Sequence, residues 1–260
     1  MTIGILGAMH GEIAELISAM IAQSGSRIER IGMRDYHVGE LNGQPCVVAL
    51  ARIGKVAAAA TTVSLIREFN VTEIIFTGLA GGIAAEAKVG DVVLADQLIQ
   101  HDLDASPIFP RYEVPLLGMS TFATDAALSA ELKIAAENFL RDDLPHAITQ
   151  KNQDIFQLQQ VALHVGTIAS GDQFISDIAH ASRIVTALPE VLAVEMEGAA
   201  VAQICYEYGV PCAILRTISD RADATAHVDF GQFLDGVASH YSAGIVRRFL
   251  SERSSRSINI

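Results

Sequence analysis

Positive charge is scarce in this sequence of 260 residues. It has 18 Lys and Arg residues against 30 Asp and Glu residues, which gives a formal net charge of -12. No segment rich in Lys or Arg interrupts this acidic balance. We therefore expect no surface that binds nucleic acid or another polyanion.

Cysteine is also scarce. Cys46, Cys205 and Cys212 show neither a CxxC pair nor the spacing of metal ligands. Cys205 and Cys212 lie in apolar segments, where a small, buried and reduced thiol is the usual state. The cysteines therefore predict no metal site.

The sequence lacks the long apolar run of a membrane helix, which needs about 20 residues. Its N-terminus has no basic leader and no apolar stretch of signal-peptide length. This composition is typical of a cytoplasmic enzyme. Because no Pro, Ser or Gly-rich linker divides the chain, we expect a single catalytic domain over residues 1–250 and a flexible tail over residues 251–260.

Half of the residues are hydrophobic, enough for a large core. Short apolar runs that are each followed by a turn predict buried strands. These runs are residues 3–6, 73–77, 89–95, 165–169, 191–194 and 212–215. An Asn42-Gly43 turn between two further strand-like runs predicts a hairpin. Together these features predict a mixed sheet in which antiparallel strands join parallel ones.

Helical patterns lie between the predicted strands. We expect helices at residues 13–21, 56–69, 125–140, 177–188, 198–208 and 230–249. Thr124 is the expected cap of the third of these, and Gly209 the expected left-handed end of the fifth. Residues 141–160 are polar, and we expect a loop there with one short helix or hairpin arm.

Acidic residues collect after the predicted strands. Glu195 and Glu197 follow one buried strand, Asp220 follows the next, and Glu12 lies just after the first. A lone acid at such a place often only caps the next helix. Glu195, Glu197 and Asp220 together at the carboxyl ends of two strands favour a ligand site, because open α/β sheets bind their ligands at that edge.

Two other motifs could indicate a cofactor or a metal site. The glycine turn after the first strand lacks the spacing of a dinucleotide or triphosphate cradle. His101, Asp102 and Asp104 suggest a metal cluster, but no matching ligands occur elsewhere, which favours a surface or interface loop. No cofactor and no metal are expected. The proline-stiffened loop at residues 105–118 carries Ile108 and Phe109, which need cover from a second subunit or from a pocket.

Six motifs in this order resemble one enzyme family. They are GILGAMHGE, TGLAGGI, VGDVV, SGDQFI, VEMEGAAVAQ and RTISDRAD. The chain is similar to the methylthioadenosine/S-adenosylhomocysteine nucleosidases, within the purine nucleoside phosphorylase-like superfamily. The resemblance runs from the first strand to Phe249 and is weakest over residues 105–160. It implies a three-layer α/β/α sandwich around a central mixed, mostly parallel twisted sheet.

The resemblance implies hydrolysis of an adenine N-glycosidic bond by a homodimeric enzyme of methionine salvage. Asp220 matches the acid that protonates adenine, Glu12 the base that activates water, and Glu197 the ligand of the ribose hydroxyls. The other site residues that it implies are Met9 and Phe230 at the 5′ substituent, Met196 on the ribose, Phe174 and Ile175 at the adenine, Ile108 from the partner subunit, and Leu79, Glu195 and Ser219.

Three departures from the family pattern bear on the site. Leu79 stands where the family usually has a serine that helps to orient the acid. His10 and Gly11 stand where relatives often carry acids. The loop at residues 105–118 differs from the usual sequence at the 5′ pocket, which affects substrate preference.

Three alternatives remain open. A phosphate-dependent nucleoside phosphorylase shares the fold, but Leu79 cannot satisfy a buried phosphate dianion, although Arg52 could supply a cation. A hydrolase of a related nucleoside, such as futalosine or its amino analogue, differs only in the 5′ pocket. A non-catalytic nucleoside-binding protein is disfavoured by Glu12, Glu197 and Asp220, because a pure binder gains little from both an acid and a base.

Overall fold

A computed structural model describes residues 1–223 and 226–258, and within these residues ten strands form one mixed sheet. The strands are β1 Ile3–Gly7, β2 Arg27–Ile31, β3 Arg34–Leu41, β4 Gln44–Leu50, β5 Glu73–Gly82, β6 Val92–Gln100, β7 Thr121–Ala123, β8 Leu163–Ser170, β9 Val191–Glu195 and β10 Cys212–Asp220.

Five of the strands close into a ring. The sheet order is β10-β6-β8-β9-β5-β1-β4-β3-β2, and β10 also pairs in parallel with β5. The ring is completed by a short antiparallel contact in which Gly81 and Gly82 of β5 lie opposite Val194 and Ala193 of β9. Beyond the ring, β1 and β4 run parallel, and β2 and β3 extend the sheet as antiparallel strands. The ring brings the ends of β5, β9 and β10 together.

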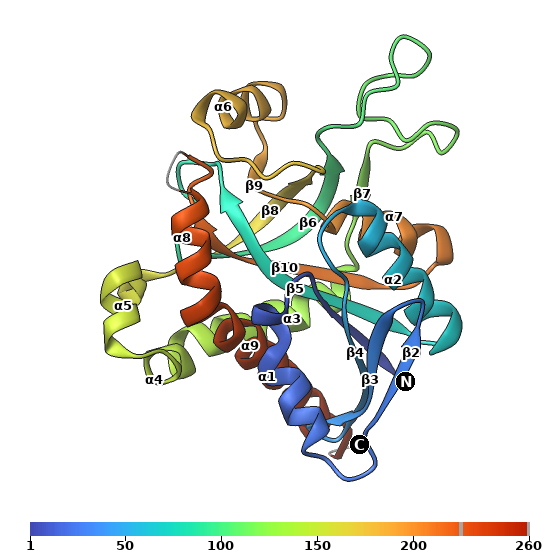
Figure 1. Ribbon diagram of the computed structural model, residues 1–260, viewed down its shortest axis with the longest axis vertical. Helices are drawn as coiled ribbons and strands as arrows, with labels where there is room; N and C mark the ends of the chain where they lie inside the picture. The colour runs from blue at the N-terminus through green and yellow to red at the C-terminus, as the bar shows by residue number, and fades with distance from the viewer. Residues whose placement is uncertain (224–225, 259–260) are drawn as a thin grey trace.

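Helices cover both faces of the sheet (Figure 1). They are α1 His10–Ile21, α2 Lys55–Glu68, α3 Ala126–Asn138, α4 Leu144–Ala147, α5 Gln150–Phe156, α6 Ile178–Ala187, α7 Gly198–Tyr208, α8 Ala226–Phe233 and α9 Ser239–Ile258. One hydrophobic core lies under α1, α3 and α9 and a second under α2 and α7. Two apolar layers against one sheet confirm the predicted three-layer α/β/α class.

The structure corrects several local predictions. Asp125, not Thr124, caps α3, because its side chain accepts a hydrogen bond from the backbone N of Leu128. Residues 141–160 are largely helical and contain α4 and α5, where a loop with a single arm was expected. Asparagine, glutamine and proline in this segment weaken the helical pattern in the sequence. The short helices are stabilised by tertiary contacts, such as the hydrogen bond that the Asn152 side chain donates to the carbonyl of Gly236.

The C-terminal helix also differs from its prediction. In place of one helix over residues 230–249, α8 and α9 are joined by a π-helical turn at Leu234–Ala238, and α9 reaches Ile258. Most of the expected tail is thus helical. Ser254 and Asn42 are bonded across the end of the β3–β4 hairpin, which provides contacts beyond Phe249. Residues 259 and 260 of that predicted tail lie outside the described residues.

Candidate active site

A cavity of about 480 Å³ lies at the carboxyl ends of β1, β5, β9 and β10. Most of the predicted site residues line it, and the structure adds others. Its lining consists of Ala8, Met9, Glu12, Ile53, Leu79, Ala80, Gly81, Gln173, Phe174, Ile175, Val194, Glu195, Met196, Glu197, Asp220, His227 and Phe230. The ring closure of the sheet explains why segments so distant in sequence share one cavity.

Glu12 lies in the first turn of α1, and its side chain is buried. One carboxylate oxygen accepts hydrogen bonds from the backbone N of Ala8 at 2.6 Å and of Met9 at 2.9 Å. The other accepts one from the backbone N of Leu79 at 3.1 Å. Burial raises the pKa of Glu12, while the Arg216 charge and the three backbone N–H groups lower it and favour the ionised form.

Gly78 of β5 is required by this arrangement. A Cβ atom at residue 78 would lie only 2.8 Å from Oε1 of Glu12, so any larger residue would displace the carboxyl group. The glycine at residue 78 therefore allows the side chain of Glu12 to lie close against β5.

Asp220 ends β10 and is also buried. Its Oδ2 accepts a hydrogen bond from the hydroxyl of Ser219 at 2.9 Å, and its Oδ1 accepts one from the backbone N of Ala222 at 2.9 Å. Burial raises the pKa of Asp220 and so favours the protonated acid. Residue 79 is a leucine and offers no hydroxyl to this acid. Ser219, which does not line the cavity, supplies one instead.

Glu12 and Asp220 face the same strand at two places. The position of a Cβ on Gly78 would touch Glu12, and that of a Cβ on Gly81 would lie 3.0 Å from Oδ1 of Asp220. Three residues of extended strand span about 10 Å. Both carboxyl groups line the same cavity, from two places along β5.

Glu197 sits at the start of α7, and its Oε1 accepts a hydrogen bond from the backbone N of Gly54 at 2.9 Å. Burial and the neighbouring charge of Glu195 raise the pKa of Glu197 to about 8, while Arg216 lowers it. A positive charge beside this carboxyl group would lower its pKa and favour its ionised form.

Glu195 has its oxygens engaged by the protein. They accept hydrogen bonds from Arg216 Nη2 at 2.7 Å, from the hydroxyl of Ser170, and from the backbone N of Glu197 and Gly198. The guanidinium of Arg216 is buried and stacks 3.9 Å from the ring centre of Phe76. Glu195 therefore fixes the turn between β9 and α7, on which Glu197 stands.

Arg216 and Ser170 were missed from the sequence. Arg216 is the one charged residue within the apolar run of β10 before Asp220, and an isolated charge in a buried strand requires a partner. That signal could have identified the Arg216–Glu195 pair. Ser170 ends β8, but serine after a strand is too common to be a signal.

Aromatic and apolar residues form the other wall of the cavity. Phe174 is 46% exposed and meets Phe230 edge to face, with 5.7 Å between the ring centres. Met9, Met196 and the buried Ile175 lie on the same lining. The half-open ring of Phe174 offers a flat surface at the mouth of the cavity, as a base-stacking residue requires.

Ile108 does not line the cavity. It is 82% exposed on the loop between β6 and β7, which projects from the sheet at the top of Figure 1, and Leu116 on the same loop is 92% exposed. The prediction placed Ile108 in the active site of a second subunit, across a dimer interface. In its own chain Ile108 does not line the pocket.

No group of three or more His, Cys, Asp or Glu residues within the described chain is arranged to hold a metal ion. The His101 region instead contains an ion pair of Lys55 with Asp102, which also accepts a hydrogen bond from the backbone N of Asp172. None of the helices in the described chain is long and apolar enough to cross a membrane.

A closed mixed sheet thus carries two buried carboxyl groups, Glu12 and Asp220, at one largely apolar cavity. The chain belongs to the phosphorylase superfamily, whose family model matches residues 2–251. Within that superfamily it is an N-glycosyl hydrolase of the nucleosidase type, as its relatives indicate.

Two curated relatives and one solved structure illustrate the similarity. The aminodeoxyfutalosine nucleosidase of Helicobacter pylori is 35% identical over 96% of this chain and 98% of its own length. The 5′-methylthioadenosine/S-adenosylhomocysteine nucleosidase of Shewanella oneidensis is 33% identical over 99% and 100%. The crystal structure of the corresponding Neisseria meningitidis enzyme with methylthio-immucillin-A has a TM-score of 0.83 and 35% identity, and covers 96% of this chain and 99% of that one.

Proposed function

We propose that this protein hydrolyses the N-glycosidic bond of 5′-methylthioadenosine, S-adenosylhomocysteine or both, and releases adenine and the 5′-thioribose. The observation that carries the proposal is that Glu12 and Asp220, both buried, line one cavity. Cleavage through an oxocarbenium-like state needs an acid on one side of the sugar and a base on the other.

Asp220 is the proposed acid. Adenine leaves as a neutral base only if a proton reaches its ring as the glycosidic bond breaks. Burial favours the protonated form of Asp220, and the hydroxyl of Ser219 and the backbone N of Ala222 fix the orientation of its carboxyl group. Ser219 is therefore a positioning residue.

Glu12 is the proposed base. Its carboxylate accepts hydrogen bonds from three backbone N–H groups, which lower its pKa against the larger raising effect of burial and fix its direction. A water molecule held by Glu12 would attack the anomeric carbon on the face opposite the adenine. Leu79, whose backbone orients Glu12, places an apolar side chain beside this water.

Glu197 is the proposed partner of the ribose hydroxyls, which a carboxylate binds by charge-assisted hydrogen bonds. In its ionised form its negative charge would also favour the cation that develops on the sugar in the transition state. Met196 would then pack on the ribose, Phe174 would stack on the adenine, and Ile175 would offer backbone groups to its edge.

The 5′ substituent would lie against Met9 and Phe230. A second subunit would complete this end of the pocket through Ile108, whose 82% exposure on an apolar loop leaves a surface that needs cover. We propose a homodimer on this ground. We also propose that residues 1–250 form one catalytic domain, and that the enzyme acts in methionine salvage in the cytoplasm.

A related nucleoside is a second candidate, because the Helicobacter pylori relative is named for aminodeoxyfutalosine. A phosphorylase is less well supported. Arg216, the buried cation next to the site, is paired with Glu195, and Arg52 lines a separate cleft and not this cavity. Leu79 offers no hydroxyl, so a phosphate dianion at this end of the cavity would lack partners.

Adenine release from methylthioadenosine, S-adenosylhomocysteine and aminodeoxyfutalosine, with and without inorganic phosphate, tests the proposal. We expect release without phosphate and the free pentose as product. Release that requires phosphate would select the phosphorylase, and binding without release from any of the three would select a non-catalytic protein. Asp220→Asn provides the control for contaminating activity.

A further inference from the structure

A second, smaller cleft of about 140 Å³ is rich in basic side chains. His10, Arg34, His37 and Arg52 line it, together with Ile17, Met33, Asp35 and Leu50. Two arginines beside two histidines in one small space are unexpected in a chain of net charge -12. Burial lowers the pKa of His37, so the arginines supply the positive charge. The cleft therefore has the composition of an anion site.

Two nitrogen atoms of this cleft are buried without a hydrogen-bond partner among the described residues. They are Nε of Arg34 and Nδ1 of His37. A guanidinium nitrogen can only donate, so it needs an acceptor, and buried polar groups are rarely left unpaired. Asp35, the acid of the lining, forms an ion pair with Arg30 at 3.8 Å. An acceptor brought by a ligand would satisfy the Arg34 donor.

Arg52 is held in a strained backbone conformation. Its φ angle is 68°, in the left-handed region that favours glycine. One nitrogen of its guanidinium, Nη2, donates to the carbonyl of Met33, which fixes the side chain at the cleft. A strained residue that glycine could replace at lower cost indicates that its side chain has a use.

The cleft adjoins the active-site cavity. Met9 and Ile53 line the cavity, and the next residues in the chain, His10 and Arg52, line the cleft. Gly7 at the end of β1 pairs with Leu50 at the end of β4, and β3 begins beside them. Neighbouring strands are about 4.8 Å apart, so two strand spacings, about 10 Å, separate β1 from β3. An extended 5′ substituent of a nucleoside in the cavity would have to span a distance of this order to reach the cleft.

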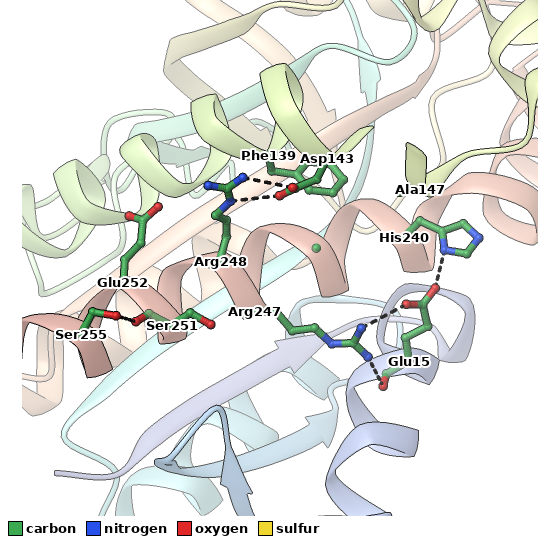
Figure 2. A pocket seen from close by; sticks show the side chains of 11 residues that line it. Glu15, Phe139, Asp143, Ala147, His240, Arg247, Arg248, Ser251, Glu252 and Ser255 are labelled. Atoms are coloured by element: carbon green, nitrogen blue, oxygen red, sulfur yellow. Dashed lines mark hydrogen bonds and ion pairs between the residues drawn. The ribbon is translucent and has the colours of Figure 1, made fainter. Parts of the chain in front are cut away.

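A larger groove on the outer side of α9 has a different character. Figure 2 shows Arg247 and His240 paired with Glu15, and Arg248 paired with Asp143. Its cations are thus already neutralised by acids of the protein. The basic cleft is distinguished by donors that have no such partner.

We propose that this cleft binds the carboxylate of an anionic 5′ substituent, and so makes the enzyme favour substrates that carry one. The proposal rests on the proposed function, which places the 5′ substituent against Met9. S-Adenosylhomocysteine has a carboxylate on its amino-acid tail and aminodeoxyfutalosine has one on its aromatic ring, whereas methylthioadenosine ends in a methyl group. A guanidinium binds a carboxylate by strong charge-assisted hydrogen bonds.

The test compares kcat/KM for the three nucleosides in the wild type, Arg52→Gln, Arg34→Gln and Arg67→Gln. Arg67 is an exposed arginine at the far end of α2 and provides the matched control for lost charge. We expect the ratio of kcat/KM for a carboxylate substrate to that for methylthioadenosine to fall about tenfold in Arg52→Gln and Arg34→Gln, and to stay constant in Arg67→Gln. Arg52→Gly, which relaxes the backbone at residue 52, should lower the ratio equally and keep the fold.

The carboxylate source is identified by which substrate loses more, S-adenosylhomocysteine or aminodeoxyfutalosine. The methyl ester of S-adenosylhomocysteine, whose tail has no negative charge, should not respond to Arg52→Gln. An equal change for the ester and the acid, or an unchanged ratio in both cleft variants, would overturn the proposal while hydrolysis of methylthioadenosine stands. If the wild type releases adenine from none of the nucleosides, the proposed function fails and this inference fails with it.

Discussion

Replacing Glu197 by Gln should stabilise the protein in a pH-dependent way. Gln has nearly the same shape and keeps an oxygen that can accept the hydrogen bond from the backbone N of Gly54. It removes a carboxyl group whose pKa rises from 4.5 to about 8 on burial beside Glu195. The raised pKa lowers the free energy of unfolding wherever Glu197 is ionised in the unfolded chain and protonated in the folded one.

The sign and size follow from linkage. Below pH 4.5 Glu197 is protonated in both states, so its raised pKa costs nothing. Between pH 4.5 and 8 the unfolded state releases the proton, and the wild type loses about 1.4 kcal/mol of stability for each pH unit relative to the variant. The 3.5-unit shift gives an upper limit of about 5 kcal/mol at pH 8. At pH 6 the corresponding gain is about 2 kcal/mol.

Urea unfolding of wild type and Glu197→Gln at pH 5, 6.5 and 8 measures this difference. We expect the gain in free energy of unfolding to grow steadily with pH. Glu68→Gln, at an exposed position at the end of α2, is the control and should show no such trend. A gain that is equal at all three pH values, or a variant less stable than wild type at pH 8, would refute the assignment of a buried, raised pKa to Glu197.

Three further predictions concern activity. Asp220→Asn should lower kcat by about 10²- to 10⁴-fold with little change in KM for methylthioadenosine, because it removes proton transfer and leaves the pocket intact, as steady-state kinetics will show. Phe174→Ala should raise KM about tenfold through lost stacking on the adenine, whereas Ile178→Ala, at an exposed position on α6, should not. The pH profile of kcat/KM should fall at low pH as Glu12 is protonated and at high pH as Asp220 ionises, with both limbs displaced upward from the usual carboxyl pKa values because burial raises both. A flat profile across pH 4–9 would contradict these roles.

The gathering of these acids at one cavity was predictable because they follow strands directly. Glu12, Glu197 and Asp220 each stand within a few residues of a short apolar run, and the carboxyl ends of such strands share an edge. Local sequence is sufficient for this inference. Gly209, with φ 65° at the end of α7, was predictable for the same reason, since a left-handed helix end favours glycine.

Features that depend on distant contacts were not predictable. The ring closure of the sheet rests on the contact of β5 with β9, about 110 residues apart, and nothing in either strand signals it. The engagement of Glu195 by Arg216 and Ser170 is likewise a tertiary contact, so the sequence placed Glu195 with the substrate-binding residues. With Leu79 in place of the usual serine, the partner of Asp220 was uncertain from the sequence. The structure shows that the hydroxyl of Ser219 donates to Asp220.

The basic cleft shows the same limit. His10 and Arg52 could not be grouped in advance, because residues 10, 34, 37 and 52 approach one another only when β1, β4 and β3 lie side by side. The strain at Arg52 is visible in the backbone alone.

Hydrolysis of methylthioadenosine in oxygen-18 water without phosphate tests the central claim most directly. If Glu12 activates water and Asp220 protonates adenine, the released 5-methylthioribose will carry one oxygen-18 atom at its anomeric carbon, and added phosphate will change neither the rate nor the product. Formation of an unlabelled pentose 1-phosphate, or release of adenine only when phosphate is present, would contradict the account.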